Sequence, residues 1–137
     1  VQDPGNVGTV LRTLDAFDAR GLILLPGCAD AFGPKTVRAA MGAHFRRTVL
    51  TLELPALAAL LHRSGMPLYG AALREDTVDA RALRYEGAAI AIGSEGRGLS
   101  REVLEICDKT VRIPMSPRCE SLNAAIAAAV LLWEAYR

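Results

Sequence analysis

The fold class of this chain is decided by the stretch Ala88-Ala89-Ile90-Ala91-Ile92-Gly93-Ser94-Glu95-Gly96-Arg97-Gly98-Leu99-Ser100. Its first half is apolar without interruption, which is typical of a parallel strand that is buried on both faces. Three glycines follow the apolar run, and Ser100 is a residue type that caps helices, with Glu102 in the favourable first turn. The stretch therefore predicts a strand, a glycine-rich loop and a helix in immediate succession.

The same alternation extends over the rest of the chain. Apolar runs predict further strands over Gly21–Leu25, Thr48–Leu52, Pro67–Leu73 and Lys109–Pro114. Apolar spacings of three and four residues, with Pro and Gly near the ends, predict helices over Asn6–Phe17, Pro34–Phe45, Leu54–Arg63, Ser100–Ile106 and Ser121–Tyr136. Strands that alternate with helices predict a single α/β domain built on a parallel sheet.

Length and composition exclude several classes of protein. The chain has 137 residues, of which 51% are hydrophobic, and a formal net charge of +1, so it is neither disordered nor a free-standing, highly basic nucleic-acid clamp. The longest apolar stretch, Ala124–Trp133, is far shorter than the ~20 residues of a membrane-spanning helix. The cysteines, Cys28, Cys107 and Cys119, lack a metal-binding spacing, so we expect reduced thiols, no metal and a cytoplasmic protein.

Three polar segments stand out as candidates for chemistry. The segment Asp3–Arg12 offers Asn6 as a helix cap and Gly8 as a site of close backbone approach. The segment Gly93–Ser100 matches neither a dinucleotide fingerprint nor a P-loop, and Ile113–Asn123 leads into a helix start that favours anions. Each segment alone also fits a structural role, as a capped helix with a surface Arg, a flexible connection or an N-cap. Together we expect them at one edge of one sheet, where ligands bind.

These segments resemble the motifs of the SpoU/TrmH-type RNA 2′-O-ribose methyltransferases of the SPOUT superfamily. The first motif, N-x-G-x-x-x-R, appears as Asn6–Arg12, and the second, G-x-E-x-x-G-[LM], as Gly93–Leu99. The third, I-P-M followed by S-L-N, appears as Ile113–Met115 and Ser121–Asn123. The motifs keep the family's order and spacing over nearly the whole chain. One departure is Ala124–Ala127, where many relatives have V-S-V-A, and it affects a minor helix contact only.

The resemblance implies a parallel-sheet α/β fold with a deep C-terminal trefoil knot, which general topology rules disfavour. It implies S-adenosylmethionine as the cofactor, RNA (rRNA or tRNA) as the substrate, and a homodimer packed through the first and last helices. It also implies that residues 1–137 are a catalytic domain that lacks an upstream RNA-binding domain and most of the first strand. The opening Val1-Gln2-Asp3-Pro4, without Met, agrees with that expectation.

The resemblance also assigns roles to residues of this sequence. It implies Arg12 as the catalytic Arg, oriented by Asn6. The other catalytic positions would be Glu95, Ser121 and Asn123. The cofactor would be lined by Ala72, Leu73, Gly93, Ile113, Met115 and Leu122, and the RNA would be bound by Arg12, Arg97 and Arg118, with Arg38, Arg46 and Arg47 as further candidates.

The role of Arg12 is open between two kinds of catalysis. The family's Arg is proposed to draw the proton from the ribose 2′-hydroxyl, but a guanidinium with a pKa above ~12 is a poor base. Positioning a phosphate or stabilising the forming alkoxide is the other role.

Two other functions are alternatives to methyl transfer. One is a knotted module that binds cofactor and RNA without catalysis. Five intact motif residues argue against it: Asn6, Arg12, Glu95, Ser121 and Asn123. The other is a different nucleotide-binding α/β enzyme, against which the absence of a Gly-Lys phosphate motif argues.

Overall fold

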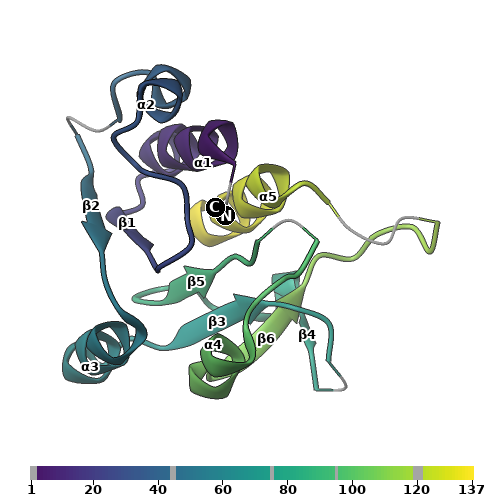
Figure 1. The fold of residues 1–137 in the computed structure, drawn as a ribbon. Coiled ribbons are helices and arrows are strands. Elements are labelled where there is room, and N and C mark those ends of the chain that lie inside the picture. The colour runs from purple at the N-terminus through teal and green to yellow at the C-terminus, as the bar shows by residue number, and fades with distance from the viewer. Residues whose placement is uncertain (1–2, 44–45, 75, 95, 119–121) are drawn as a thin grey trace.

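Helices and strands alternate along the chain, as the sequence predicts (Figure 1). The computed structural model describes residues 3–43, 46–74, 76–94, 96–118 and 122–137. The elements, in chain order, are α1 (Pro4–Ala16), β1 (Gly21–Leu24), α2 (Pro34–Ala40), β2 (Thr48–Thr51), α3 (Leu54–Ser64), β3 (Leu68–Ala71), β4 (Val78–Asp79), a 3₁₀ turn (Ala80–Ala82), β5 (Ala89–Ala91), α4 (Arg101–Ile106), β6 (Lys109–Arg112) and α5 (Ala124–Tyr136).

The strands form two parallel sheets, and the expectation of one sheet is wrong. β1 pairs with β2, while the second sheet has the order β4-β6-β3-β5, and every pair is parallel. Within the described ranges, no strand is hydrogen-bonded to the second edge of β1 or of β5. The strands therefore do not form one continuous hydrogen-bonded sheet, since β1 and β5 are edge strands of two separate sheets.

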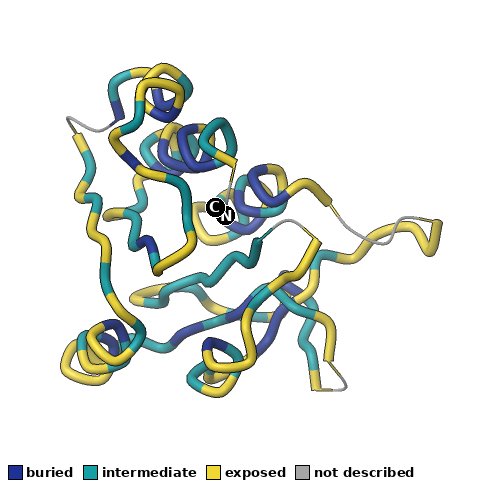
Figure 2. The backbone as a smooth tube through the Cα atoms, viewed as in Figure 1, coloured by how far each residue is buried: buried dark blue, intermediate teal, exposed yellow. Residues whose placement is uncertain are grey.

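Helix α1 lies at the centre of the apolar core. Its buried side chains Val10, Leu11 and Leu14 pack with Ala125 and Ala128 of α5, and Figure 2 shows both helices dark blue where they face each other. The small alanines of α5 allow the two helices to pack closely. Ile92, the last apolar residue before the glycine-rich loop, packs against the same cluster, so the second motif is anchored to the helix that carries the first.

Two helix ends differ from the predicted ones. α1 begins at Pro4 instead of Asn6, because the Asp3 carboxylate caps it and accepts hydrogen bonds from the Gly5 and Asn6 amides at 2.7 and 3.2 Å. Asn6 is therefore inside the helix and is not its cap. α2 ends at Ala40 instead of Phe45, since Met41 (φ 51°) and Gly42 (φ 87°) adopt left-handed conformations that end a helix.

The remaining helix ends agree with the sequence. Ser100 caps α4, and Gly65 ends α3 in a left-handed conformation. Asn123, one of the two predicted starts of the last helix, caps α5 by accepting from the Ala125 and Ile126 amides at 2.8 and 3.3 Å. In the part of the chain that the structure describes, none of the helices has the length and hydrophobicity needed to cross a membrane.

Candidate active site

The first motif lies on α1 where this helix packs against α2. A Cβ atom added to Gly8 would lie 2.5 Å from the Thr36 carbonyl oxygen and 2.6 Å from the Ala39 Cβ. The buried Thr36 hydroxyl donates to the Pro4 carbonyl oxygen at 3.2 Å, which fixes the start of α2 beside the first turn of α1. The close approach predicted at Gly8 is thus confirmed, and it is an approach to helix α2.

Arg12 follows Gly8 by one helical turn and lies on the same side of α1. Its side chain is exposed, and it forms no hydrogen bond or ion pair with any residue that the structure describes. An exposed guanidinium on a helix that is packed into the core is suited to bind an anionic group.

Asp15, on the same side of α1, binds two arginines from the loop between α2 and β2. Its carboxylate accepts hydrogen bonds from Nε of Arg46 and Nε of Arg47, each at 2.7 Å. Nη2 of Arg47 also lies 3.0 Å from Oδ1 of Asp18. These hydrogen bonds, from Arg46 and then Arg47, lower the pKa of Asp15. Arg46 and Arg47 were candidates for RNA contacts, but the structure shows that both already have a carboxylate partner.

The second motif forms a closed loop after β5. Ser94 and Gly98 exchange two backbone hydrogen bonds, at 3.2 and 3.0 Å, and Gly96 and Gly98 have φ of 82° and 69°. A Cβ atom on Gly93 would lie 2.1 Å from the Gly98 carbonyl carbon, so glycine is required there for the loop to close. Arg97 is exposed on this loop, while Glu95 lies outside the described residues.

The third motif connects β6 to α5. Ile113 is half-buried at the end of β6, whereas Met115, Arg118 and Leu122 are exposed. Figure 1 shows the segment after β6 running outward from the body of the molecule. Ser121 lies outside the described residues, and the oxygen of the Asn123 side chain is bonded to the first turn of α5.

The strand order brings three of the predicted cofactor segments together. β3 lies between β5 and β6, so the residues that follow these strands, Ala72, Gly93 and Ile113, leave neighbouring positions of one parallel sheet. Leu73 is 74% exposed, and Met115 and Leu122 are also exposed apolar side chains. Exposed apolar side chains of this kind are suited to cover the adenine and aliphatic parts of a nucleoside cofactor.

One polar contact beside these segments was missed by sequence reasoning. The Thr77 hydroxyl lies 2.8 Å from the hydroxyl of Thr110 and accepts from the Arg74 amide at 2.6 Å, so it joins the loop after β3 to strand β6. Thr110 is buried within β6. The signal in the sequence was weak, because a threonine in a strand pattern is read first as a β-branched residue.

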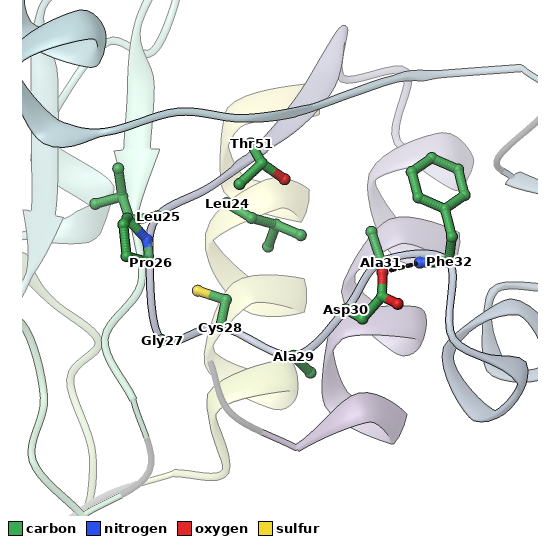
Figure 3. Close-up of a pocket in the computed structure, with 10 residues that line it drawn as sticks. All are labelled: Leu24, Leu25, Pro26, Gly27, Cys28, Ala29, Asp30, Ala31, Phe32 and Thr51. Atoms are coloured by element: carbon green, nitrogen blue, oxygen red, sulfur yellow. Dashed lines mark hydrogen bonds between the residues drawn. The ribbon is translucent and has the colours of Figure 1, made fainter.

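Each of the two sheets has a cavity beside it in the described structure. The first, of about 250 Å³, lies at the carboxyl ends of β1 and β2 and is drawn in Figure 3. The second, of about 200 Å³, lies between Arg81, Pro114 and Glu134 and includes Ile113 in its wall. The other predicted cofactor residues line neither cavity. Within the described ranges, no three His, Cys, Asp or Glu side chains are grouped so that they could hold a metal.

Comparison with known proteins assigns the chain to a family. The model of the SpoU rRNA Methylase family matches residues 1–133. The chain belongs to this family. A Bacillus subtilis relative, 23S rRNA (guanosine(2553)-2′-O)-methyltransferase RlmP, is 40% identical over 97% of this chain and 54% of its own length.

Solved structures of SpoU-family relatives have the same fold. The AdoMet-bound rRNA methyltransferase of Sinorhizobium meliloti is 35% identical with a TM-score of 0.93, over 98% of this chain and 52% of that one. AviRb of Streptomyces viridochromogenes, solved with AdoMet, is 32% identical with a TM-score of 0.92, and the match covers 98% of this chain and 56% of AviRb. This SpoU-family chain spans about half the length of the curated relatives it matches.

Proposed function

We propose that this SpoU-family domain transfers a methyl group from S-adenosylmethionine to the 2′-hydroxyl of a ribose in structured RNA, either rRNA or tRNA. The observation that carries the proposal is Arg12, an exposed guanidinium without a partner among the described residues, on the motif-one helix at the centre of the core. The relatives that act on ribose 2′-oxygens of 23S rRNA support the choice of substrate.

The cofactor would be held beside the carboxyl ends of β3, β5 and β6. In this proposal the backbone at Ala72 and Gly93 meets its polar groups, and the exposed Leu73 and Met115 cover its apolar surface, together with Ile113 and Leu122. When bound, it supplies a methyl group on a sulfonium, which is already activated for transfer. The AdoMet-bound structures of the relatives support this assignment.

The protein then has to align the ribose 2′-oxygen with the methyl group and assist the removal of the 2′-hydroxyl proton. We assign Arg12 to the substrate, where a permanent cation stabilises the forming alkoxide or holds the adjacent phosphate. Alignment alone can lower a barrier by about 7–11 kcal/mol in favourable systems. Asn6 sits half-buried in the first turn of the same helix, suited to orient Arg12 or the ribose. Glu95, Ser121 and Asn123 complete the proposed set, and Asn123 also keeps its cap of α5.

RNA binding would use exposed arginines around this centre. Arg97 and Arg118 are exposed on the second and third motifs and have no carboxylate partner among the described residues. Phosphate contacts of this type position RNA without reading its sequence. Arg46 and Arg47 contribute less in this proposal, because Asp15 already binds them. The site of action would be the cytoplasm, a proposal that the bacterial rRNA methyltransferases among the relatives support.

The whole assembly would be a knotted homodimer. The last strand, β6, lies between the two earlier strands β4 and β3, a strand order compatible with a C-terminal trefoil knot. The outer face of α5 exposes Ile126, Val130 and Trp133 at spacings of four and three residues, an apolar stripe suited to a second copy. We assign residues 1–137 to the catalytic domain.

The variant Arg12→Ala tests this function. Because Arg12 lies on the substrate side, we expect the variant to bind S-adenosylmethionine in calorimetry with nearly the wild-type Kd. Methyl transfer to RNA transcripts should fall by at least about a hundredfold, as for loss of one electrostatic catalytic group. Wild-type transfer rates in this variant would contradict the role of Arg12, and a wild-type chain that binds no S-adenosylmethionine would contradict the function itself.

A further inference from the structure

The connection between β3 and β4 crosses strand β6 beside the proposed cofactor segments. Ala71, at the end of β3, and Val78, at the start of β4, both pair with Val111, although β3 and β4 lie on opposite sides of β6. The six residues between them therefore pass over one face of β6 and span two interstrand spacings, about 10 Å. This connection begins with two of the residues proposed to hold the cofactor, Ala72 and Leu73.

The Thr77 hydroxyl has three hydrogen-bond partners in this connection and in β6. It accepts from the Arg74 amide at 2.6 Å, donates to the Ala72 carbonyl oxygen at 3.3 Å and lies 2.8 Å from the hydroxyl of the buried Thr110. A hydroxyl has one hydrogen and two lone pairs. Because the hydrogen of Thr77 goes to Ala72, the Thr110 hydroxyl is the donor in the third contact. The hydrogen-bonding capacity of Thr77 is thus fully used.

Two of these bonds fix the peptide groups on both sides of Leu73. The Ala72 carbonyl belongs to the peptide group before Leu73, and the Arg74 amide belongs to the one after it. With both peptide planes held by one hydroxyl, the backbone torsions of Leu73 are fixed, and with them the direction of its side chain, which is 74% exposed.

The same two bonds orient the backbone polar groups of Leu73. In a trans peptide the N–H and C=O groups point in opposite directions, so the Leu73 N–H and C=O point away from Thr77. Neither has a hydrogen-bond partner among the residues that the structure describes. Backbone groups of this kind commonly orient a ligand in a pocket.

Other bonds hold the rest of the connection without the Thr77 hydroxyl. The Ala72 amide donates to the Val111 carbonyl oxygen at 3.2 Å, and the Thr77 amide donates to the Arg74 carbonyl oxygen at 3.2 Å. Loss of the hydroxyl would leave these bonds in place and release only the two peptide groups around Leu73. The effect of removing it is therefore expected to be local.

We propose that Thr77 is a positioning residue for the cofactor, because its hydroxyl holds both peptide groups around Leu73 in the arrangement that binds S-adenosylmethionine. This inference rests on the proposed function and deepens it, since it names the side chain that shapes one wall of the cofactor site. Thr77 acts through Leu73 and does not touch the reacting atoms. Its contribution is to cofactor affinity and not to the methyl-transfer step.

The variant Thr77→Val tests this role, because valine has nearly the same shape without the hydroxyl. We expect the Kd for S-adenosylmethionine in calorimetry to rise by about 5- to 100-fold, the range for the loss of two hydrogen bonds. With saturating cofactor and RNA transcripts, kcat should stay close to the wild-type value, since Arg12 is unchanged. Thr77→Ser keeps the hydroxyl and should restore most of the affinity.

The matched control is Thr110→Val. This variant removes the contact between the two hydroxyls but keeps the bonds from Thr77 to Ala72 and Arg74. We expect it to bind S-adenosylmethionine with nearly the wild-type Kd. A general loss of stability would weaken binding in this variant as well, so the pair separates positioning from stability.

Exchange of the Arg74 amide hydrogen, followed by NMR in the free protein, gives a readout that needs neither cofactor nor RNA. This amide donates to the Thr77 hydroxyl, and a hydrogen-bonded amide exchanges only when the bond opens. We expect exchange at least about fivefold faster in Thr77→Val, and near the wild-type rate in Thr77→Ser and Thr110→Val.

The outcomes separate this inference from the function on which it rests. The positioning role is wrong, and the function stands, if Thr77→Val binds S-adenosylmethionine like the wild type, if Thr77→Ser restores nothing, if Thr110→Val loses as much affinity, or if exchange of the Arg74 amide is unchanged. If the affinities follow the expected pattern but the wild type methylates no RNA, the positioning role stands and methyl transfer is wrong. A wild-type chain that binds no S-adenosylmethionine would overturn both.

Discussion

At the scale of single residues, Gly8 and Arg12 have different roles in the first motif. Gly8 allows close helix packing, and Arg12 is the side chain proposed to act in the chemistry. Gly8 lets α1 and α2 approach until an added Cβ would overlap the Thr36 carbonyl oxygen. Arg12, one turn later, has no partner among the described residues. The motif spacing of four residues thus keeps a packing position and a reactive position on the same side of one helix.

Gly8→Ala tests the packing half of this account. Alanine is normally better than glycine in a helix interior by about 1 kcal/mol, but overpacking costs about 1–3 kcal/mol or more. Because the Thr36 carbonyl is backbone and cannot move aside cheaply, we expect the free energy of unfolding in urea to fall by about 1–3 kcal/mol. Thr9→Ala, at an exposed position of α1, should change it by less than about 1 kcal/mol. A more stable Gly8→Ala protein would contradict the packing.

At the scale of elements, local patterns predicted strands and helices well and their ends less well. The four apolar runs and the shorter Thr48–Leu52 run all contain strands, and every predicted helix exists. The sequence predicts the start of α1 two residues late, because Asn6 is the expected cap whereas Asp3 caps the helix. β4, of two residues, is too short to leave a pattern of its own.

Asp79 illustrates how a short element can depend on pH. Its carboxylate accepts from the Arg81 amide at 2.9 Å and from Arg81 Nη2 at 2.8 Å, which holds the 3₁₀ turn after β4. The hydrogen bonds from Arg81 lower the pKa of Asp79 from 3.8 to about 2. A folded-state pKa below the unfolded value stabilises the protein above the unfolded pKa, and the effect is lost as the pH falls through the folded pKa.

The variant Asp79→Asn isolates this charge, since Asn can still cap the turn. We expect the stability difference between wild type and Asp79→Asn to be constant above pH 3.8 and to disappear between pH 3.8 and about 2, as measured by urea unfolding at a series of pH values. In an Arg81→Gln background the pH-dependent part of this stability difference should be much smaller, because only the weaker attraction of Arg112 still lowers the pKa of Asp79. A difference that persists unchanged toward pH 2 would contradict the assigned pair.

At the scale of the whole molecule, the sequence predicted the class of fold and the family but not how the sheets are joined. Parallel pairing follows from apolar runs between helices, whereas the break between β1 and β5 depends on long-range contacts that no local pattern encodes. The candidate site is predicted in part. Ala72, Gly93 and Ile113 follow neighbouring strands, but Glu95 and Ser121 lie outside the described residues. Their roles, and an upstream RNA-binding domain, stay predictions.

The apolar stripe on α5 makes the oligomeric state testable. Ile126, Val130 and Trp133 are 53%, 38% and 50% exposed, and Trp133 packs against Phe17, the residue that follows α1, at 5.7 Å between ring centroids. We expect Ile126→Glu to weaken a wild-type dimer at least about a hundredfold in sedimentation analysis, because it would bury a charge in the proposed interface. Leu50→Glu, on exposed β2, should leave the dimer intact. A wild-type chain that sediments at its monomer mass of 14.6 kDa would contradict the dimer.

The central claim is methyl transfer to a ribose oxygen, and the most direct test is the chemical position of the transferred methyl group. The chain would be incubated with methyl-labelled S-adenosylmethionine and unmodified 23S rRNA and tRNA transcripts, and the RNA then digested with alkali. Alkaline cleavage needs a free 2′-hydroxyl, so a 2′-O-methylated nucleotide survives within an alkali-resistant dinucleotide. The account predicts that the label appears in such a dinucleotide and is lost with Arg12→Ala. Label recovered only in mononucleotides, as from base methylation, or no label in any RNA, would contradict it.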